Sequence, residues 1–231
     1  MHYFSCCILI VNMTFRAGKK NKSSLTGILT MYAVIFLLWT GYRIFFRLPE
    51  WVDEFVAKPI LWISPLILFQ KKLLTQMVKS LKINVSYNIL FGLSIGILYF
   101  CVYTLFSSFQ FGLPMLNLMY FSLKGICLQL IIAFSTGLIE ELVFRRYFLE
   151  EALLFFNDRI ISNSFVTLLF TLIHLPIIIF VYKYSFAETI SYLSLLTISG
   201  FIYGLVYLHK KSLLASTMTH AMWNFLGTII R

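Results

Sequence analysis

The sequence predicts an all-α fold, a polytopic bundle of about seven transmembrane helices (between about six and eight), from three observations. First, 60% of the 231 residues are hydrophobic and only 12% are charged, with a mean hydropathy of +0.87. A soluble domain has about a quarter charged residues. Second, apolar runs of about 20 residues, the length that crosses the hydrocarbon core, recur along the chain. Third, lysines and arginines gather in the short segments between these runs, as in cytoplasmic loops.

The chain opens with a basic segment, residues 1–24, which precedes the first apolar run. The stretch from Met1 to Met13 lacks the basic start and the cleavage site of a signal peptide, so we expect either a short interfacial segment or an extension upstream of the true start. The first predicted span runs from Leu25 to Phe46. Arg43 lies near its end, where a long side chain can extend toward the membrane surface. The basic residues before this span include Lys19, Lys20 and Lys22.

The rest of the N-terminal half, which ends at residue 124, is expected to contain further transmembrane helices. The acidic stretch from Arg47 to Lys58 predicts a loop on the outer side. Pro59 to Phe69 is apolar but short, so an extended span and a re-entrant segment both stay open. Tyr87 to Phe109 is long enough to span. The basic residues that separate these two runs are Lys71, Lys72, Lys79 and Lys82.

Residues 125–231 are expected to form the core that carries the function, and they contain the remaining spans. With a cytoplasmic N-terminus, the basic clusters after Phe69, at Arg145-Arg146 and at Lys210-Lys211 all fall on the inner side. Two pairs of glycines four residues apart allow neighbouring helix backbones to approach closely. The apolar runs are Gly125 to Ile139 with its helical continuation Phe144 to Phe156, Asn163 to Tyr182, Thr189 to Leu208 and Leu213 to Ile230, and the glycine pairs are Gly92/Gly96 and Gly200/Gly204.

The net charge of +10 does not indicate nucleic-acid binding. A nucleic-acid-binding surface needs basic residues gathered on one face, whereas here they flank apolar runs. The partners that we expect are the lipid bilayer and a peptide or membrane-protein substrate. The four cysteines have neither metal-ligand spacing nor the pattern of a disulfide framework. They are Cys6, Cys7, Cys101 and Cys127.

Three polar signatures interrupt the most apolar half of the chain. An ionisable group at the centre of a membrane helix costs about 2.5–3.5 kcal/mol on insertion scales, so such groups face a bundle interior or a wet cavity and usually have a function. Because the three signatures lie on separate apolar helices, we expect their polar side chains to assemble into one site. The signatures are Glu140-Glu141 with Arg145, Phe170 with His174, and His220 with Asn224.

Glu140 and Glu141 are expected to have different roles, because neighbours on a helix point about 100° apart. Glu141 and Arg145 are four residues apart on one face, where an ion pair forms. That pair would hold Glu141 and leave Glu140 free to act as a general base. The alternative from this segment alone is a solvated helix end, because further charged residues follow at Arg146, Glu150 and Glu151.

The two histidine motifs are each compatible with simple helix packing. His174 follows Phe170 by four residues, and Pro176 weakens the local helix by removing a hydrogen-bond donor. His220 and Asn224 share a face of the last helix, where each could satisfy the other. Together they are also typical of a pair of neutral donors that stabilises an oxyanion.

In order and spacing, the three motifs resemble those of the CPBP intramembrane proteases, the CAAX prenyl endopeptidase and bacteriocin-processing proteins also called the Abi family. The resemblance covers roughly Ile131 to Ile230. It implies that Glu140 and His174 activate a water molecule, that Glu141 supports the site through Arg145, and that His220 and Asn224 stabilise the oxyanion. In the motif Phe-x-x-x-His, the resemblance gives Phe170 a supporting role beside His174.

The sequence leaves the question of a metal open. Two histidines and a carboxylate could bind zinc, in which case the ligands would be Glu140, His174 and His220. There is no His-Glu-x-x-His helix, and the family is interpreted both as metalloprotease and as glutamate protease. Metal-free chemistry is the reading that we favour.

The function that we expect is an intramembrane endopeptidase of the bacterial plasma membrane, with its N-terminus in the cytoplasm. It would cut a membrane-associated peptide or protein near the cytoplasmic interface, for maturation of a bacteriocin or signalling peptide or for self-immunity. The sequence has no feature that indicates recognition of a prenyl group. Two alternatives remain. One is a non-catalytic immunity or scaffold protein, and the other is a proton-coupled transporter with buried Glu and His as a relay.

Overall fold

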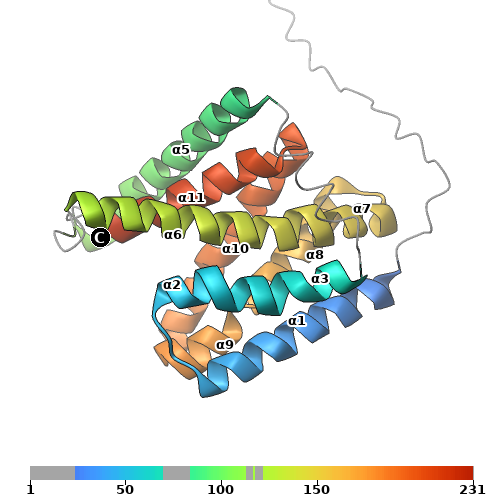
Figure 1. Ribbon diagram of the computed structural model, residues 1–231. Helices are drawn as coiled ribbons and strands as arrows, with labels where there is room; N and C mark the ends of the chain where they lie inside the picture. The colour runs from blue at the N-terminus through green and yellow to red at the C-terminus, as the bar shows by residue number, and fades with distance from the viewer. Residues whose placement is uncertain (1–23, 70–83, 113–116, 118–121, 231) are drawn as a thin grey trace, which may run out of the picture.

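The computed structural model describes residues 24–69, 84–112, 117 and 122–230. The predicted N-terminal segment 1–24 lies almost entirely outside these residues, as do the lysines between residues 70 and 83 and two of the four cysteines. The described residues form helices joined by short connections, which confirms the all-α prediction (Figure 1). Each of the seven predicted apolar segments is helical. Five described helices are long and apolar enough to cross a membrane.

The N-terminal half contributes three helical segments. α1 spans Leu25–Phe45 and begins at Ser24, whose side chain accepts a hydrogen bond from the Gly27 amide. A second helix runs without interruption from residue 50 to residue 69, and α5 spans Val85–Phe111. The second helix comprises α2 (Glu50–Val52), the π-helical segments η1 (Asp53–Ala57) and η2 (Pro59–Ile63), and α3 (Ser64–Phe69).

The predicted loop from Arg47 to Lys58 is wrong for most of its length. The connection covers only residues 46–49, and the helix starts at Glu50. Asp53 and Glu54 are each 6% exposed, because they pair with Arg43 of α1 and with Lys58 inside the bundle. The charges that indicated a loop are therefore interior charges with interior partners. The apolar run that starts at Pro59 is the second half of this longer helix.

The C-terminal half begins with a continuous helix of 34 residues from Leu123 to Phe156. It comprises α6 (Leu123–Glu141), the π-helical segment η4 (Leu142–Leu149) and α7 (Glu150–Phe156). The predicted continuation across Phe144 to Phe156 is thus confirmed. The helix ends at Asn157, which adopts a left-handed conformation (φ 52°) and turns the chain toward the next helix.

Three further helical segments complete the bundle. Each of the first two ends at a lysine in the left-handed conformation, Lys183 (φ 54°) and Lys211 (φ 50°), and serine or aspartate side chains cap the starts of the three. The last, α11, has 17 residues. The segments are α8 (Arg159–Leu172) with α9 (Leu175–Ile177) and η5 (Ile178–Tyr182), then α10 (Phe186–Lys210), then α11 (Leu213–Ile229).

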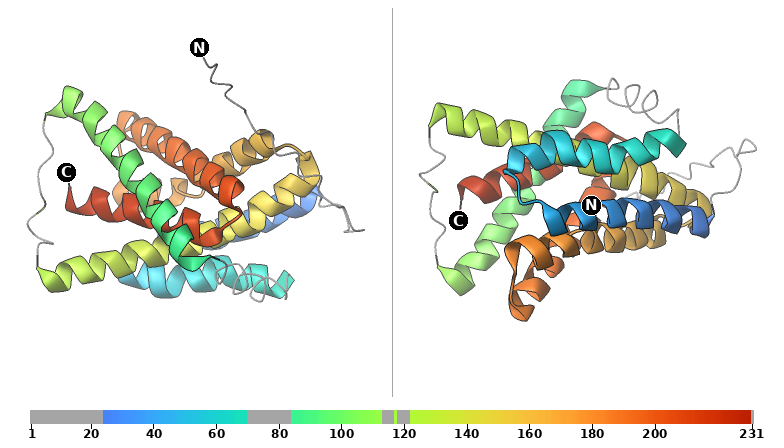
Figure 2. Two further views of the ribbon diagram at one scale, coloured as in Figure 1. Left: turned by 90° about the horizontal axis from the view of Figure 1, so that it is seen from above. Right: turned by 60° about the horizontal axis from the view of Figure 1, so that its bottom comes forward.

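The helices run up and down between two ends of the bundle. The α1–α2 turn and the C-terminus lie at one end, and the α7–α8 turn lies at the other (Figures 1 and 2). This alternation is the one that the predicted order of spans requires. The helix of residues 50–69 lies alongside both α1 and the long helix α6–η4, so the N-terminal half packs directly on the segment that carries Glu140.

The glycine pairs lie where helices approach closely, as predicted. A Cβ atom on Gly96 of α5 would lie 2.8 Å from Met222 Cβ and 2.9 Å from the Thr219 carbonyl oxygen, both on α11. Thr219 Oγ1 donates to the Gly92 carbonyl at 3.0 Å. On α10, a Cβ atom on Gly200 would lie 2.8 Å from the Phe170 ring of α8. These contacts position α8 and α11, which carry motif residues, against α10 and α5.

Candidate active site

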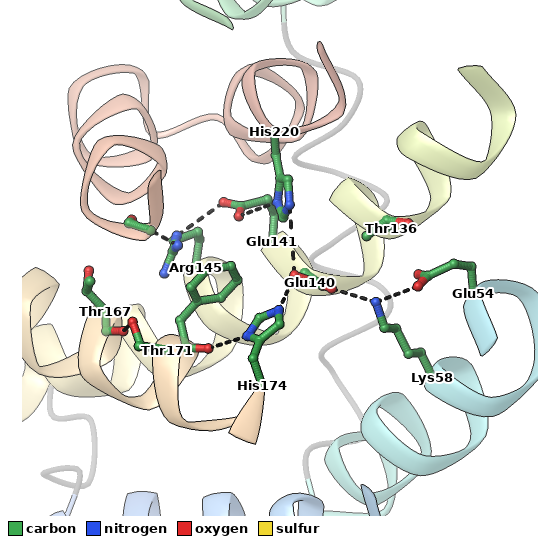
Figure 3. Close-up of polar contacts among 12 residues, drawn as sticks. Glu54, Lys58, Thr136, Glu140, Glu141, Arg145, Thr167, Thr171, His174 and His220 are labelled. Carbon is green, nitrogen blue, oxygen red and sulfur yellow. Dashed lines mark hydrogen bonds and ion pairs between the residues drawn. The ribbon is translucent and has the colours of Figure 1, made fainter. Parts of the chain in front are cut away.

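The carboxylates of Glu140 and Glu141 lie at the end of α6, where the helix widens into the π-helical segment η4. Glu140 is 2% exposed and Glu141 is fully buried. Local π-helical geometry inside an α-helix is frequent at functional sites. The two side chains point in different directions, as expected for neighbours on a helix (Figure 3).

Glu141 pairs with Arg145, as predicted from the four-residue spacing. Arg145 Nε lies 3.2 Å from Glu141 Oε2, and neither side chain is exposed to solvent. Arg145 also donates from Nη2 to the Gly200 carbonyl oxygen of α10 at 3.0 Å, and its guanidinium lies 5.2 Å from the centre of the Phe170 ring. The guanidinium thus links η4 to α8 and α10.

The structure brings both motif histidines to Glu140. The Nε2 atoms of His174 and His220 each lie 3.9 Å from Glu140 Oε2 (Figure 3). This separation exceeds a direct hydrogen bond and is of the size at which a bridging water is considered. One carboxylate oxygen is therefore faced by two imidazole nitrogens from two other helices.

His174 is held with a defined ring nitrogen toward Glu140. Its Nδ1 lies 2.8 Å from the carbonyl oxygen of Phe170, one turn earlier in α8. Because a carbonyl oxygen only accepts, Nδ1 carries the hydrogen and Nε2 of the neutral ring is an acceptor. Two acceptors, Nε2 and Glu140 Oε2, then face the space between them, and one water molecule can donate to both.

His220 is fixed on two sides. Its Nδ1 lies 3.2 Å from Glu141 Oε1, and its ring stacks on the buried ring of Tyr203 with centroids 4.4 Å apart and planes inclined by 18°. The Phe170 ring lies 5.0 Å from the His174 ring and 6.1 Å from the His220 ring. Phe170 therefore packs edge-on against both histidine rings.

Asn224 lies one helical turn beyond His220 on α11 and lines the same cavity. Among the described residues its side-chain amide has no hydrogen-bond partner, so the packing alternative, in which this amide and His220 satisfy each other, does not form here. A donor that none of the described residues engages, at the wall of the Glu140 cavity, can bind a substrate.

Two residues of this site were missed by sequence reasoning. Lys58 Nζ lies 2.5 Å from Glu140 Oε1 and 2.7 Å from Glu54 Oε1, and Lys58 is 6% exposed. The Glu141–Arg145 pairing had led us to expect that Glu140 would have no charged partner. That expectation is wrong, because Lys58 pairs with Glu140. The spacing of four between Glu54 and Lys58 was a usable signal for an ion pair on a helix. The pairing with Glu140, 82 residues away, was not predictable from spacing.

The site opens onto a cavity of about 750 Å³, within the range of small-molecule and peptide side-chain pockets. Aromatic side chains dominate one part of its wall, and hydroxyl or amide side chains are interspersed. The residues of the candidate site that line it are Glu54, Lys58, Glu140, Phe170, His174, His220 and Asn224, and the aromatic lining includes Trp39, Trp62, Phe100, Tyr103, Tyr192 and Trp223.

The three residues that could bind a zinc ion, Glu140, His174 and His220, are not arranged as a metal site. Within the described part of the chain, no group of three His, Cys, Asp or Glu side chains has the spacing to hold a metal ion. The ammonium group of Lys58, in contact with Glu140, would also repel a divalent cation at that carboxylate. We therefore derive no chemical step through a metal.

Residues 122–226 match the family described as Type II CAAX prenyl endopeptidase Rce1-like. We refer to this matched part of the chain as the Rce1-like domain. All three predicted motifs lie inside the Rce1-like domain, which confirms the resemblance drawn from them, whereas Glu54 and Lys58 lie outside it. No curated protein and no solved structure matches this chain.

The five long apolar helices indicate an integral membrane protein, and the matched family is one of CAAX-type intramembrane proteases. Such a protein acts on a peptide substrate in a bilayer setting.

Proposed function

We propose that this protein is an intramembrane endopeptidase in which Glu140 activates water for hydrolysis of a peptide bond. One observation carries the proposal, namely that Nε2 of His174 and Nε2 of His220 both face Glu140 Oε2 at 3.9 Å on the wall of a cavity. This is the arrangement that a general base needs to hold and orient a water molecule.

The reaction proceeds with each group in a defined role. Glu140 Oε2 takes a proton from water, with His174 Nε2 as the second acceptor that orients it, and the hydroxide oxygen attacks the peptide carbonyl carbon. The carbonyl oxygen gains negative charge, and side-chain donors of Asn224 and His220 stabilise it. The proton held on Glu140 then passes to the leaving nitrogen as the C–N bond breaks. The products are a carboxylic acid and an amine, because the second hydrogen of the water stays on the oxygen that attacked.

Glu141 and Arg145 do not contact the substrate and act through His220. Glu141 accepts a hydrogen from His220 Nδ1 and so directs Nε2 toward the reacting centre, while Arg145 holds Glu141 in place. A histidine directed in this way by a carboxylate behind it is a recurrent device of hydrolytic sites.

The substrate that we propose is a membrane-associated peptide or protein, cut in the course of bacteriocin or signalling-peptide maturation or of self-immunity. The aromatic cavity wall favours apolar side chains next to the cleaved bond. The family description, CAAX prenyl endopeptidase, suggests prenylated C-terminal peptides as a second substrate class to test beside these. Glu140 lies within a helix that is long and apolar enough to cross the membrane, so the scissile bond must reach into the bundle.

The test compares peptide termini in the membrane fraction of the native host between wild type and Glu140→Gln at matched expression. Glutamine keeps the shape of the side chain but cannot accept the proton. We expect a new terminus in the wild type that is absent from Glu140→Gln and from His174→Gln. Identical sets of termini in all three strains would contradict proteolysis.

One observation favours the alternative of a non-catalytic binding or immunity protein. Lys58 occupies Glu140 Oε1, so only one of the two carboxylate oxygens is open to water. That alternative predicts that Glu140→Gln still restores whatever the deletion strain lacks.

A further inference from the structure

The helix of residues 50–69 reaches the site from outside the Rce1-like domain, and it places one lysine between two carboxylates. Lys58 Nζ lies 2.5 Å from Glu140 Oε1 and 2.7 Å from Glu54 Oε1 (Figure 3). All three side chains are nearly inaccessible, with exposed side-chain fractions of 3–8%. Charges at this depth persist only when they are paired.

The position of Lys58 is fixed by packing as well as by charge. One helical turn further on, Trp62 is 1% exposed and packs edge-on against Trp39 of α1, with centroids 5.2 Å apart, and against Phe144 of η4, at 5.9 Å. Lys58 Nζ itself lies 5.3 Å from the centre of the Trp62 ring. The lysine is therefore held on a rigid helix that is docked on the same segment that carries Glu140.

The contact divides the two oxygens of Glu140 between different partners. Oε1 faces the ammonium group of Lys58, whereas Oε2 faces both histidines. A carboxylate held at one oxygen cannot rotate about its last bond without breaking a charge-assisted hydrogen bond. The orientation that presents Oε2 to the water site is therefore set from the N-terminal half of the chain.

We propose that Lys58, held in turn by Glu54, is the positioning residue of the site: it binds Oε1 of Glu140 and thereby directs Oε2 toward the attacking water. The proposal rests on the proposed function. It adds that the domain of residues 122–226 is incomplete without the helix of residues 50–69. Among the described residues, the ion pair of Glu54 is with Lys58, at 2.7 Å.

The experiment uses the full chain reconstituted in liposomes and a synthetic peptide that spans the cleavage site found in the host. Lys58→Met removes the charge at similar length and should lower kcat about a hundredfold, the effect of misplacing a reacting group by about 1 Å, with KM unchanged. Lys58→Arg retains a cation and should recover part of the lost kcat. Glu54→Gln should lower kcat less than Lys58→Met does, and it should cause no further loss when combined with Lys58→Met.

The matched control is Lys211→Met, which removes another lysine with a glutamate partner. Lys211 Nζ lies 3.8 Å from Glu150 Oε1, its side chain is 45% exposed, and it does not line the cavity. We expect wild-type kcat from this variant. If Lys58→Met matches the control while Glu140→Gln is inactive, the proposed function stands and the positioning role is overturned.

A second readout does not depend on proteolysis. The infrared carboxylate band of Glu140 is obtained by subtracting the spectrum of the Glu140→Gln variant from that of the protein that retains Glu140. This difference spectrum is recorded once in the wild-type background and once in the Lys58→Met background. A band that moves on loss of Lys58, together with the fall in kcat, supports the proposal. A band that does not move overturns it whatever the activity. A wild type that cleaves no peptide overturns the proposed function and this role with it.

Discussion

Buried charges at the site are each tied to a partner from another turn or another helix. Glu141, Arg145 and Glu140 have almost no exposed surface, and each contacts an opposite charge at 3.2 Å or less. Such pairs contribute little net stability when intact, because desolvation offsets the attraction. Removing one member is costly, because the other is left buried and unpaired.

Glu141→Gln should therefore lower the free energy of unfolding by about 3–5 kcal/mol, since Arg145 loses its only carboxylate contact among the described residues. The double variant Glu141→Gln with Arg145→Met should recover much of this loss, because no unpaired charge remains. Unfolding by increasing SDS in mixed micelles, followed by circular dichroism, measures both. A double variant whose loss equals the sum of the two single losses would show that the pair is not coupled.

The packing of the helices on one another depends on close approach of their backbones at glycine residues. Gly92 and Gly96 of α5 face α11 without room for a side chain, and α11 carries His220 and Asn224. The sequence predicted this from the small-residue spacing alone, because packing of membrane helices depends on how closely the backbones can approach.

Gly96→Ala should destabilise the protein by about 1–3 kcal/mol, the cost of overpacking a tight interface. Its Cβ atom would lie 2.8 Å from Met222 Cβ, so α11 must shift. Gly41→Ala is the control, since a Cβ atom on Gly41 of α1 meets no atom within 4 Å. The control should gain about 0.5–1 kcal/mol from reduced backbone freedom in the unfolded chain. Equal midpoints of SDS unfolding in the two variants would contradict close packing of α5 on α11.

The sequence predicted local features of the helices well and contacts between distant residues poorly. Helices with uniform apolar composition were placed correctly to within a few residues, and the pair Glu141–Arg145 followed from helical spacing. The helix of residues 50–69 was misjudged because its charges were assumed to face water, whereas they face Arg43 and Glu140. A hydropathy pattern does not distinguish a solvated charge from an interior pair. Contacts between residues 82 positions apart, such as Lys58 with Glu140, leave no local pattern at all.

Across the whole molecule, the helices alternate between two ends of the bundle, and the predicted orientation places the N-terminus and the α7–α8 turn in the cytoplasm. Fusions of a fluorescent protein and of an alkaline phosphatase test this. At the turn Asn157–Asp158 we expect fluorescence without phosphatase activity, and after Arg231 the reverse, because lysine- and arginine-rich segments are retained inside. The opposite pattern at both sites would invert the orientation, and the same pattern at both would contradict the count of spans between them.

The central claim is that this chain itself hydrolyses a peptide bond through the carboxylate of Glu140. The most direct measurement is cleavage of a synthetic peptide, which spans the terminus found in the host, by the purified protein in liposomes. Wild type and Glu140→Gln are compared at equal insertion, and mass spectrometry of the products identifies the bond. We predict cleavage by the wild type at the bond cut in the host, and loss of at least about a hundredfold in Glu140→Gln, the contribution typical of a general base. Cleavage at the same rate by both proteins, or by neither, would contradict the account.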